Sequence, residues 1–312
     1  MSIAFGCLSG LDKETMASHL VMGGSGFLGR ALLRALGSRG YGTFCERPFA
    51  GGLSFNGRSD SLSALVKSIP DSLTHVYLLH GVVNPDQCAR DPGGSRDINV
   101  AGMQRLIMEA WDLGLTPVYL STDYVFDGSR GGRTEDEPTC PTTEYGRQKA
   151  EMEAWLQNWE QPSLIVRSSK IVSAETDTHS VIGQLAVEFR SGKAVRAAED
   201  QIFSPMHVDD TAKALIELAE AGETGLLHVA GEVPFSRYDL SRLLADEIVE
   251  TSPHIVPNLS RCRLAEIPFV ETRPLNTSLS VAKMRRTVSA EFVSMPALCA
   301  EAAAALRTPR VG

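Results

Sequence analysis

The sequence has no apolar run that approaches the roughly 20 residues of a transmembrane helix. It also lacks long basic clusters, since the longest is the pair at residues 285–286, and its formal net charge is −8 at pH 7. We therefore expect neither a membrane nor a nucleic acid as partner. Charged side chains at residues 12–14 interrupt any signal-peptide core, so residues 1–17 are expected to form a loosely held leader.

Cysteine is scarce, and the cysteines are scattered. None of the six forms a CxxC motif or a Cys/His pair at metal-ligand spacing. The sequence also has no internal repeat and no low-complexity tract. We expect reduced thiols, a cytoplasmic location and no metal site.

The composition that is present is that of a globular protein. Hydrophobic residues make up 43% of the 312 residues and charged residues 22%, which is typical of a soluble chain that buries a core. The length suits one large α/β unit with a smaller lobe.

A glycine-rich turn organises the N-terminal half. Residues 20–29 read Leu-Val-Met-Gly-Gly-Ser-Gly-Phe-Leu-Gly, which predicts a buried strand, a turn and the start of a helix. Gly23 permits a tight turn, Gly26 lets a phosphate approach the backbone, and Gly29 lets the helix pack closely on the strand. The free N–H groups at the helix start favour an anion. The turn therefore predicts a site for a dinucleotide pyrophosphate, and a plain strand-to-helix turn is the alternative interpretation.

The end of the second predicted strand, at residues 41–45, bears on which dinucleotide is bound. An acidic residue at this point holds a ribose 2′-hydroxyl, whereas an arginine holds a 2′-phosphate. Glu46 and Arg47 follow the strand in succession, and Pro48 ends it, so that Arg47 can reach outward. We expect NADP(H) in preference to NAD(H), with Arg47 as the phosphate contact. A solvated loop charge is the alternative for either residue.

Apolar strands and amphipathic helices alternate through the first half. This alternation predicts a Rossmann-type, doubly wound α/β fold, in which ligands bind at the carboxyl ends of the strands. We expect strands at residues 20–22, 41–45, 74–79, 116–120 and 164–167, helices at 27–36, 59–69, 95–113 and from 143, and loops at 84–94 and 126–143.

The second half mixes short strands, helices and irregular segments, which predicts a smaller C-terminal substrate lobe over the strand ends. Residues 18–169, with part of 208–230 completing the sheet, form the expected dinucleotide-binding domain, and residues 170–207 and 231–312 form the expected lobe. We expect helices at 181–189, 208–221, 235–249 and 295–306, strands at 195–197 and 226–229, and irregular chain at 201–207 and 251–278.

Tyr145 and Lys149 form a candidate proton-donating pair. Their i, i+4 spacing on a predicted helix places both on one face. A neighbouring ammonium lowers the pKa of a phenol, so that the tyrosine exchanges a proton with a carbonyl oxygen. Thr122, at a strand end, is placed to hold the same oxygen, and a nicotinamide would supply the hydride. A pair on the helix surface is the alternative explanation of this spacing.

The order of these features resembles that of the extended short-chain dehydrogenase/reductases. Within that group, the sequence is most similar to the dTDP-4-dehydrorhamnose reductase family, which includes regulatory β-subunit-like proteins of methionine adenosyltransferase. The run Ser-Thr-Asp-Tyr-Val-Phe-Asp-Gly at residues 121–128 is specific to this branch. The other matching segments are residues 23–29, 84–88, 98–100, 137–138, 141, 145–146, 149, 204–205, 208–210 and 273–276.

The resemblance implies roles for individual residues. Catalysis is assigned to Thr122, Tyr145 and Lys149, with Asn99 helping to position the lysine. Cofactor binding is assigned to Gly23, Gly26, Phe27, Leu28 and Gly29 around the pyrophosphate, to His80 and Gly81 beside the ribose, and to Tyr145 and Lys149. Substrate binding is assigned to Tyr124, His207 and Arg273, with Arg273 as a partner for a nucleotide diphosphate.

Three positions depart from the pattern of the family. The third strand, at residues 53–56, lacks an acidic end, Met206-His207 stands where a larger aromatic residue is usual, and Ser280 stands where an aspartate is usual. These departures bear on ligand specificity more than on hydride chemistry.

We therefore predict an NAD(P)H-dependent reductase that acts on the keto group of a nucleotide-activated deoxysugar of the 4-keto-6-deoxyhexose type, or on a related ketone. The resemblance also suggests a homodimer. A non-catalytic, dinucleotide-binding regulatory subunit and a nucleotide-sugar epimerase remain alternatives. A sugar 4,6-dehydratase is disfavoured, because Tyr124 follows Asp123 where such dehydratases carry a glutamate.

Overall fold

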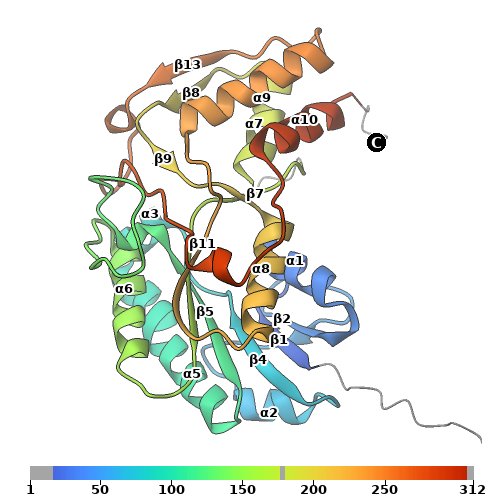
Figure 1. Cartoon of the computed structure of the whole chain (residues 1–312), viewed down its shortest axis with the longest axis vertical. Helices are drawn as coiled ribbons and strands as arrows, with labels where there is room; N and C mark the ends of the chain where they lie inside the picture. The colour runs from blue at the N-terminus through green and yellow to red at the C-terminus, as the bar shows by residue number, and fades with distance from the viewer. Residues whose placement is uncertain (1–16, 176–179, 308–312) are drawn as a thin grey trace, which may run out of the picture.

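The computed structural model describes residues 17–175 and 180–307, so most of the predicted leader lies outside the described residues. A central sheet with helices on both faces carries a smaller lobe at one end (Figure 1). Within the described parts of the chain, no helix has both the length and the apolar character needed to cross a membrane.

The central sheet has seven strands, and all of their pairings are parallel. This arrangement confirms the predicted doubly wound α/β class. In spatial order the strands are β11 (Gly225–Val229), β6 (Leu164–Ser168), β5 (Thr116–Thr122), β4 (Leu73–Leu78), β1 (Ser18–Met22), β2 (Gly40–Phe44) and β3 (Leu53–Ser54).

Burial on both faces explains why the strands are almost continuously apolar. Val21 faces one core together with helices α1 (Phe27–Leu36) and α8 (Val208–Glu220). Leu20 and Met22 face the other core. That second core is closed by α2 (Leu62–Lys67), α5 (Met103–Asp112) and α6 (Glu144–Gln157).

The strand order reverses at β1, which lies between β4 and β2. The chain leaves β1 for β2 on one side and returns to β4 on the other, so a crevice opens at the carboxyl ends of β1 and β4. The glycine turn follows β1, and His80 follows β4. The fold therefore places both features beside one crevice.

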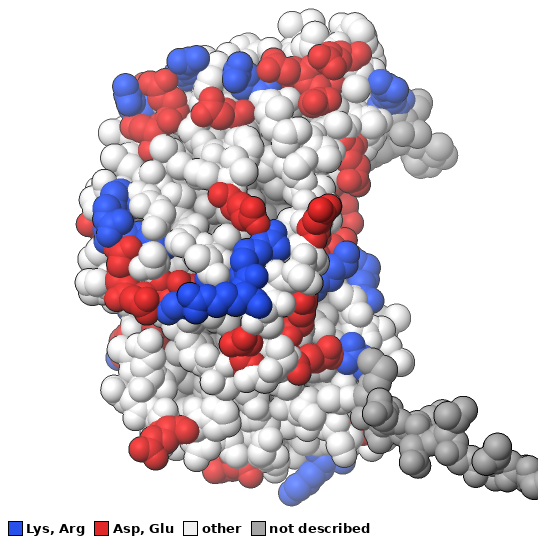
Figure 2. All heavy atoms as spheres, viewed as in Figure 1, with Lys and Arg blue, Asp and Glu red and all other residues white. Residues whose placement is uncertain are grey.

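The smaller lobe lies over the carboxyl ends of the central strands (Figure 1). Its own core is formed by three helices and a parallel strand pair. These elements are α7 (Val181–Arg190), α9 (Arg237–Thr251), α10 (Met295–Ala305), β8 (Val195–Ala198) and β13 (Leu259–Cys262). Acidic and basic side chains are interspersed over the face of the molecule in Figure 2, and some form ion pairs, such as Lys283 with Asp136 at 2.8 Å.

The predicted loop at residues 84–94 is wrong, because two short helices lie there. Asn84 caps α3 (Pro85–Arg90) and Asp91 caps α4 (Pro92–Arg96), and each helix has a proline in its first turn. Proline suits that position, although the Asn-Pro and Asp-Pro pairs also resemble turn signals. A π-helical turn at Asp97–Gly102 then leads into α5.

The segments at 201–207 and 251–278 were expected to be irregular, and this is also wrong in part. Strands β9 (Ile202–Phe203) and β10 (Met206–His207) pair with β12 (Phe235–Ser236) and β7 (Ile171–Val172), and β13 pairs with β8. Strands this short have no readable periodicity, since their partners lie far away in the chain.

Candidate active site

The glycine turn is held tightly between β1 and α1. Gly23 has a φ of +89°, and Gly26 donates its backbone N–H to the Gly23 carbonyl oxygen at 2.9 Å. A Cβ on Gly29 would lie 2.2 Å from that same oxygen. Glycine is therefore required at position 29 for the helix to pack against the turn, as the sequence predicts.

The start of α1 is suited to an anion. Gly26 is the N-cap, no side chain caps the helix, and its first turn contains no acidic residue. The first N–H groups of a helix have no partner within the helix, and the helix dipole is positive at this end. These groups would hold the pyrophosphate of a dinucleotide.

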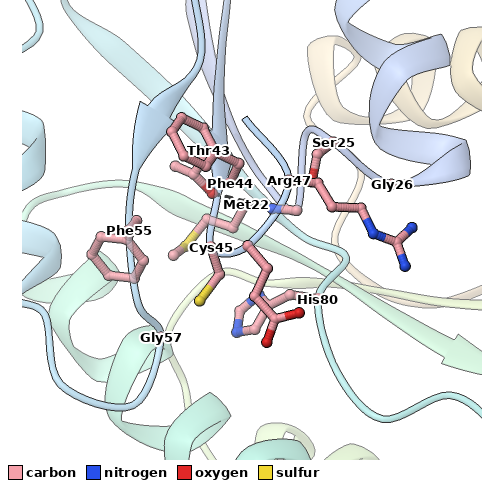
Figure 3. Close-up of a pocket in the computed structure, with 12 residues that line it drawn as sticks. Met22, Ser25, Gly26, Thr43, Phe44, Cys45, Arg47, Phe55, Gly57 and His80 are labelled. Carbon is pink, nitrogen blue, oxygen red and sulfur yellow. Dashed lines mark hydrogen bonds between the residues drawn. The ribbon is translucent and has the colours of Figure 1, made fainter. Parts of the chain in front are cut away.

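A cavity of about 290 Å³ lies beside this helix start (Figure 3). Glu46 and Arg47 both line it. The acidic residue that suits the 2′-hydroxyl of NAD(H) and the arginine that suits the 2′-phosphate of NADP(H) therefore lie in the same cavity. Arg47 extends past Ser25 in Figure 3, on the side of the glycine turn. Thr43 fixes the other side, because its hydroxyl oxygen accepts the Gly23 N–H at 3.2 Å.

The predicted cofactor residues are only partly brought together. Gly23, Gly26, Arg47 and His80 line the cavity. The side chain of Leu28 is buried in the core instead, so only its backbone N–H is available to a ligand. The other predicted cofactor residues do not line this cavity, namely Phe27, Gly29, Gly81, Tyr145 and Lys149.

His80 is neutral at pH 7. Burial, together with the positive charges of Lys149 and Arg105, lowers its pKa to about 4. A neutral imidazole offers one hydrogen-bond donor and one acceptor to a ribose or nicotinamide.

A second cavity, of about 310 Å³, is lined by the candidate catalytic residues Thr122 and Tyr145, whereas Lys149 and Asn99 are not among its lining residues. Thr122 ends β5, Tyr124 lies in the short helix that follows, and Tyr145 lies in the first turn of α6. The rings of Tyr124 and Tyr145 meet edge to face, with 6.3 Å between their centres. A Cβ on Gly146 would lie 2.2 Å from the Tyr124 carbonyl oxygen, so glycine allows this close approach.

Tyr145 is a protonated phenol at neutral pH. Burial raises its pKa, and a hydrogen bond with Thr122 opposes this effect. The expectation that Lys149 lowers this pKa is wrong for the structure described, because burial dominates and the lysine makes no identified contribution. The phenol is therefore available as a proton donor.

Lys149 lies beneath Tyr145. Its Nζ donates to the Leu120 carbonyl oxygen at 2.7 Å, and it lies 6.0 Å from the centre of the Tyr145 ring. Burial lowers the pKa of Lys149 to about 8, while the Glu153 carboxylate acts in the opposite direction. Most of the amine is therefore protonated at pH 7.

Asn99 connects the loop after β4 to α6. Its side chain accepts from the Val82 N–H at 2.8 Å and donates to the Val82 carbonyl oxygen at 2.9 Å. It also donates to Gln148 Oε1 at 2.9 Å. Asn99 has no hydrogen bond to Lys149 among the described contacts, so any influence on the lysine passes through its neighbour Gln148.

Only one of the two terminal nitrogens of the Arg273 guanidinium has a hydrogen-bond partner. Nη2 pairs with Asp86 Oδ1 at 2.5 Å, and Cζ lies 4.9 Å from the centre of the Phe269 ring. The side chain is 5% exposed, and Nη1 is buried without a hydrogen-bond partner. Pro274, the next residue, lines the catalytic cavity.

Two cations in the catalytic cavity were missed by the sequence analysis. Lys170 and Arg237 both line it, and their side chains form no hydrogen bond or ion pair with another residue in the described part of the chain. Lys170 follows β6, so the rule that ligands bind at strand ends identifies it in principle. Arg237 begins a helix in the smaller lobe, and no sequence signal marks it.

A buried acid beside Thr122 was also missed. Asp123 accepts hydrogen bonds from Thr277 Oγ1 at 2.7 Å, Ser169 Oγ at 2.9 Å and Thr122 Oγ1 at 3.2 Å. These bonds join the end of β5 to the segment that returns from the smaller lobe.

The structure does not bring His207 into the catalytic cavity. Its position in β10 is fixed by pairing with β7, and its carbonyl oxygen accepts from Thr211 Oγ1 at 2.9 Å at the start of α8. Its ring is not among the groups that line the cavity.

A doubly wound sheet with a glycine turn at its switch point, and with Thr122 on β5 facing Tyr145 and Lys149 on α6, has the architecture of the α/β proteins that bind dinucleotides. The family described as RmlD substrate binding domain matches residues 17–306. The chain belongs to this family, as predicted from its sequence.

Individual relatives agree with this assignment. The dTDP-4-dehydrorhamnose reductase of Aggregatibacter actinomycetemcomitans is 30% identical over 281 residues, which cover 87% of this chain and 93% of that protein. The methionine adenosyltransferase 2 subunit beta of Mus musculus is 26% identical over 308 residues, which cover 91% of this chain and 88% of that protein. The crystal structure of dTDP-4-dehydrorhamnose reductase from Bacillus anthracis in complex with NADP is similar in fold, with a TM-score of 0.76 at 20% identity, and covers 92% of this chain and 98% of that one.

Proposed function

We propose that this protein is an NAD(P)H-dependent reductase of the keto group of a nucleotide-activated deoxysugar. The observation that carries the proposal is that Thr122 at the end of β5 and Tyr145 on α6 line one cavity, while Lys149 on α6 lies near Tyr145 and donates to the β5 backbone. The named activity of the dTDP-4-dehydrorhamnose reductases in the same family supports the substrate class.

Each residue of the set has a distinct task. A bound nicotinamide would supply the hydride. The Tyr145 phenol, held protonated by burial, donates its proton to the carbonyl oxygen of the substrate. The Thr122 hydroxyl, which donates to Asp123 in the structure described, would turn to donate its hydrogen bond to the same oxygen. The Lys149 ammonium stabilises the negative charge left on the phenolate.

The cations around the cavity favour a substrate with a diphosphate. Lys170 and Arg237 line the cavity and form no ion pair in the described part of the chain, and the neighbouring Arg273 keeps a buried Nη1 without a hydrogen-bond partner. A phosphate group in the cavity would satisfy their free N–H donors. The diphosphate of a nucleotide sugar has the matching charge.

Arg47 at the glycine turn favours NADP(H) as the cofactor. Glu46 lines the same cavity and favours the 2′-hydroxyl of NAD(H), so the preference depends on which side chain reaches the ribose. The related structure from Bacillus anthracis contains NADP, which supports NADP(H) as the cofactor.

A second candidate function is that of a regulatory subunit that binds a dinucleotide and a partner enzyme. The similarity to the methionine adenosyltransferase subunit, which covers 91% of this chain, favours it. The complete Thr122, Tyr145 and Lys149 set favours catalysis instead.

The five cysteines of the described residues are all free thiols, which supports the proposal of a reducing, cytoplasmic location.

Calorimetry with NADPH and NADH, followed by nicotinamide absorbance after addition of dTDP-4-keto-6-deoxyglucose, separates these functions. The proposed reductase binds NADPH more tightly and consumes it. Tight binding of NADPH that is not oxidised after addition of this sugar, or of other nucleotide keto-sugars, favours the regulatory subunit. Failure to bind either dinucleotide contradicts both functions.

A further inference from the structure

A buried ion pair lies directly behind the candidate catalytic residues. Glu153 on α6 and Arg167 on β6 have side chains that are only 2% and 3% exposed. Arg167 Nη2 donates to Glu153 Oε2 at 2.7 Å, and Arg167 Nε lies 3.0 and 3.1 Å from the two carboxylate oxygens. The two side chains therefore meet in a bidentate geometry.

The carboxylate of this pair also connects the two elements that supply the catalytic groups, α6 and β5. Glu153 lies one helical turn after Lys149 on α6. Its Oε1 also accepts a hydrogen bond from the hydroxyl of Ser121, the residue before Thr122 on β5. One carboxylate thus holds the helix that carries the lysine against the strand that carries the threonine.

A contribution to the stability of the fold does not by itself explain why Glu153 and Arg167 form a buried ion pair. Desolvation makes a buried ion pair costly, and a well-packed apolar pair of similar volume is often as stable. Arg167 Cζ also lies 4.9 Å from the centre of the apolar Phe126 ring, and Nη1 lies 3.4 Å from the ring nitrogen Nε2 of His228.

We propose that Glu153, held by Arg167 and Ser121, is a positioning residue that fixes α6 on β5 and supplies the buried countercharge for the Lys149 ammonium. The lysine then keeps its charge and its direction beneath Tyr145. This inference rests on the proposed role of Lys149, but it is tested below without any turnover.

The surroundings of Lys149 leave Glu153 as its countercharge. Among the described residues, Glu153 is the only carboxylate identified as raising the lysine pKa. The His80 imidazole and the Cys88 thiol are neutral at pH 7, because burial lowers the pKa of the first and raises that of the second. The titratable groups near the ammonium are Tyr145 and Glu153 from α6, Tyr119 from β5, His80 from the end of β4 and Cys88 from α3.

The test is a titration of Lys149 by NMR in the full chain labelled with [ε-¹³C]lysine. The Lys149 signal is assigned by its loss in Lys149→Met. The wild-type midpoint is expected near pH 8. Glu153→Gln should lower it by about half a pH unit or more, which is at least a roughly threefold loss of proton affinity.

Glu151→Gln is the matched control. Glu151 lies on the same helix two residues away, but it is 38% exposed and pairs with Arg96 on the surface. This substitution should leave the Lys149 midpoint unchanged. A merely structural role for Glu153 would change the unfolding free energy without moving the midpoint.

A midpoint in Glu153→Gln equal to that of the control overturns the proposal. If that variant fails to fold because Arg167 is left without a partner, the same titration is made in the double variant Glu153→Met, Arg167→Met, which removes both charges. An unchanged midpoint there likewise overturns it. Because no substrate is used, a failure of the proposed reductase activity does not affect the result.

Discussion

Arg237 provides the sharpest test of how the substrate is bound. It begins α9 in the smaller lobe, lines the catalytic cavity and pairs with no carboxylate in the described parts of the chain. Burial lowers the pKa of its guanidinium, and the charge of Glu188 opposes this effect. Arg237→Met removes the charge and keeps much of the side-chain length.

The magnitude follows from the hydrogen bonds that a diphosphate would form. Hydrogen bonds to charged groups contribute about 1.5–3 kcal/mol, which corresponds to a roughly 10- to 150-fold change in affinity. We therefore expect Arg237→Met to bind dTDP at least about 10-fold more weakly. The free energy of unfolding should change little, because the Arg237 side chain forms no hydrogen bond or ion pair in the described part of the chain that the substitution would break.

Calorimetry of dTDP binding to the NADPH-saturated protein measures this effect. Arg196→Met is the matched control, since Arg196 lies on β8 of the same lobe, is 55% exposed and pairs with Glu266. It should leave dTDP affinity unchanged. Equal dTDP affinity of Arg237→Met and wild type, with both proteins folded and NADPH bound, would refute the anion site.

Three further predictions address the turn at α6, the cofactor and pH. Gly146→Ala should lower the free energy of unfolding by about 1–3 kcal/mol, because its Cβ would lie 2.2 Å from a backbone oxygen. Gly93→Ala, where no atom lies within 4 Å of the added carbon, should not lower it in the same urea titration. Arg47→Ala should weaken NADPH binding more than NADH binding in calorimetry, and equal losses would reject the phosphate contact. Burial lowers the pKa of His75 to about 4 and that of His228 to about 3, against 6.5 in the unfolded chain. The unfolded chain therefore binds more protons between about pH 6.5 and 4, so urea unfolding should show stability falling as pH falls through this window. A constant or rising stability would contradict the neutral, buried state of these histidines.

The dinucleotide-binding half could be predicted from sequence because its signals are local. Continuous apolar strands, helical periodicity and glycines at fixed spacing each depend on neighbouring residues only. The same reasoning placed Thr122, Tyr145 and Lys149 at the ends of adjacent elements, and the structure brings them together. Local signals were therefore sufficient for the scaffold of the site.

The remaining features depend on tertiary packing, which single-sequence patterns do not record. The pKa of Tyr145 is raised because the site is buried, and burial is a property of the assembled cavity. Lys170 and Arg237 come from separate parts of the chain and meet only where the smaller lobe packs over the sheet. His207 lies in the two-residue strand β10, outside the predicted site, and β10 forms only because it pairs with β7, which is distant in the sequence.

The central claim is that Tyr145 donates a proton during reduction of a keto-sugar. The most direct measurement is kcat for NADPH oxidation with dTDP-4-keto-6-deoxyglucose, made in parallel with NADPH affinity, for wild type, Tyr145→Phe and Tyr124→Phe. The account predicts that Tyr145→Phe loses about 10²- to 10⁴-fold in kcat with NADPH affinity nearly unchanged, and that Tyr124→Phe loses far less. A Tyr145→Phe variant that oxidises NADPH at the wild-type rate would contradict it.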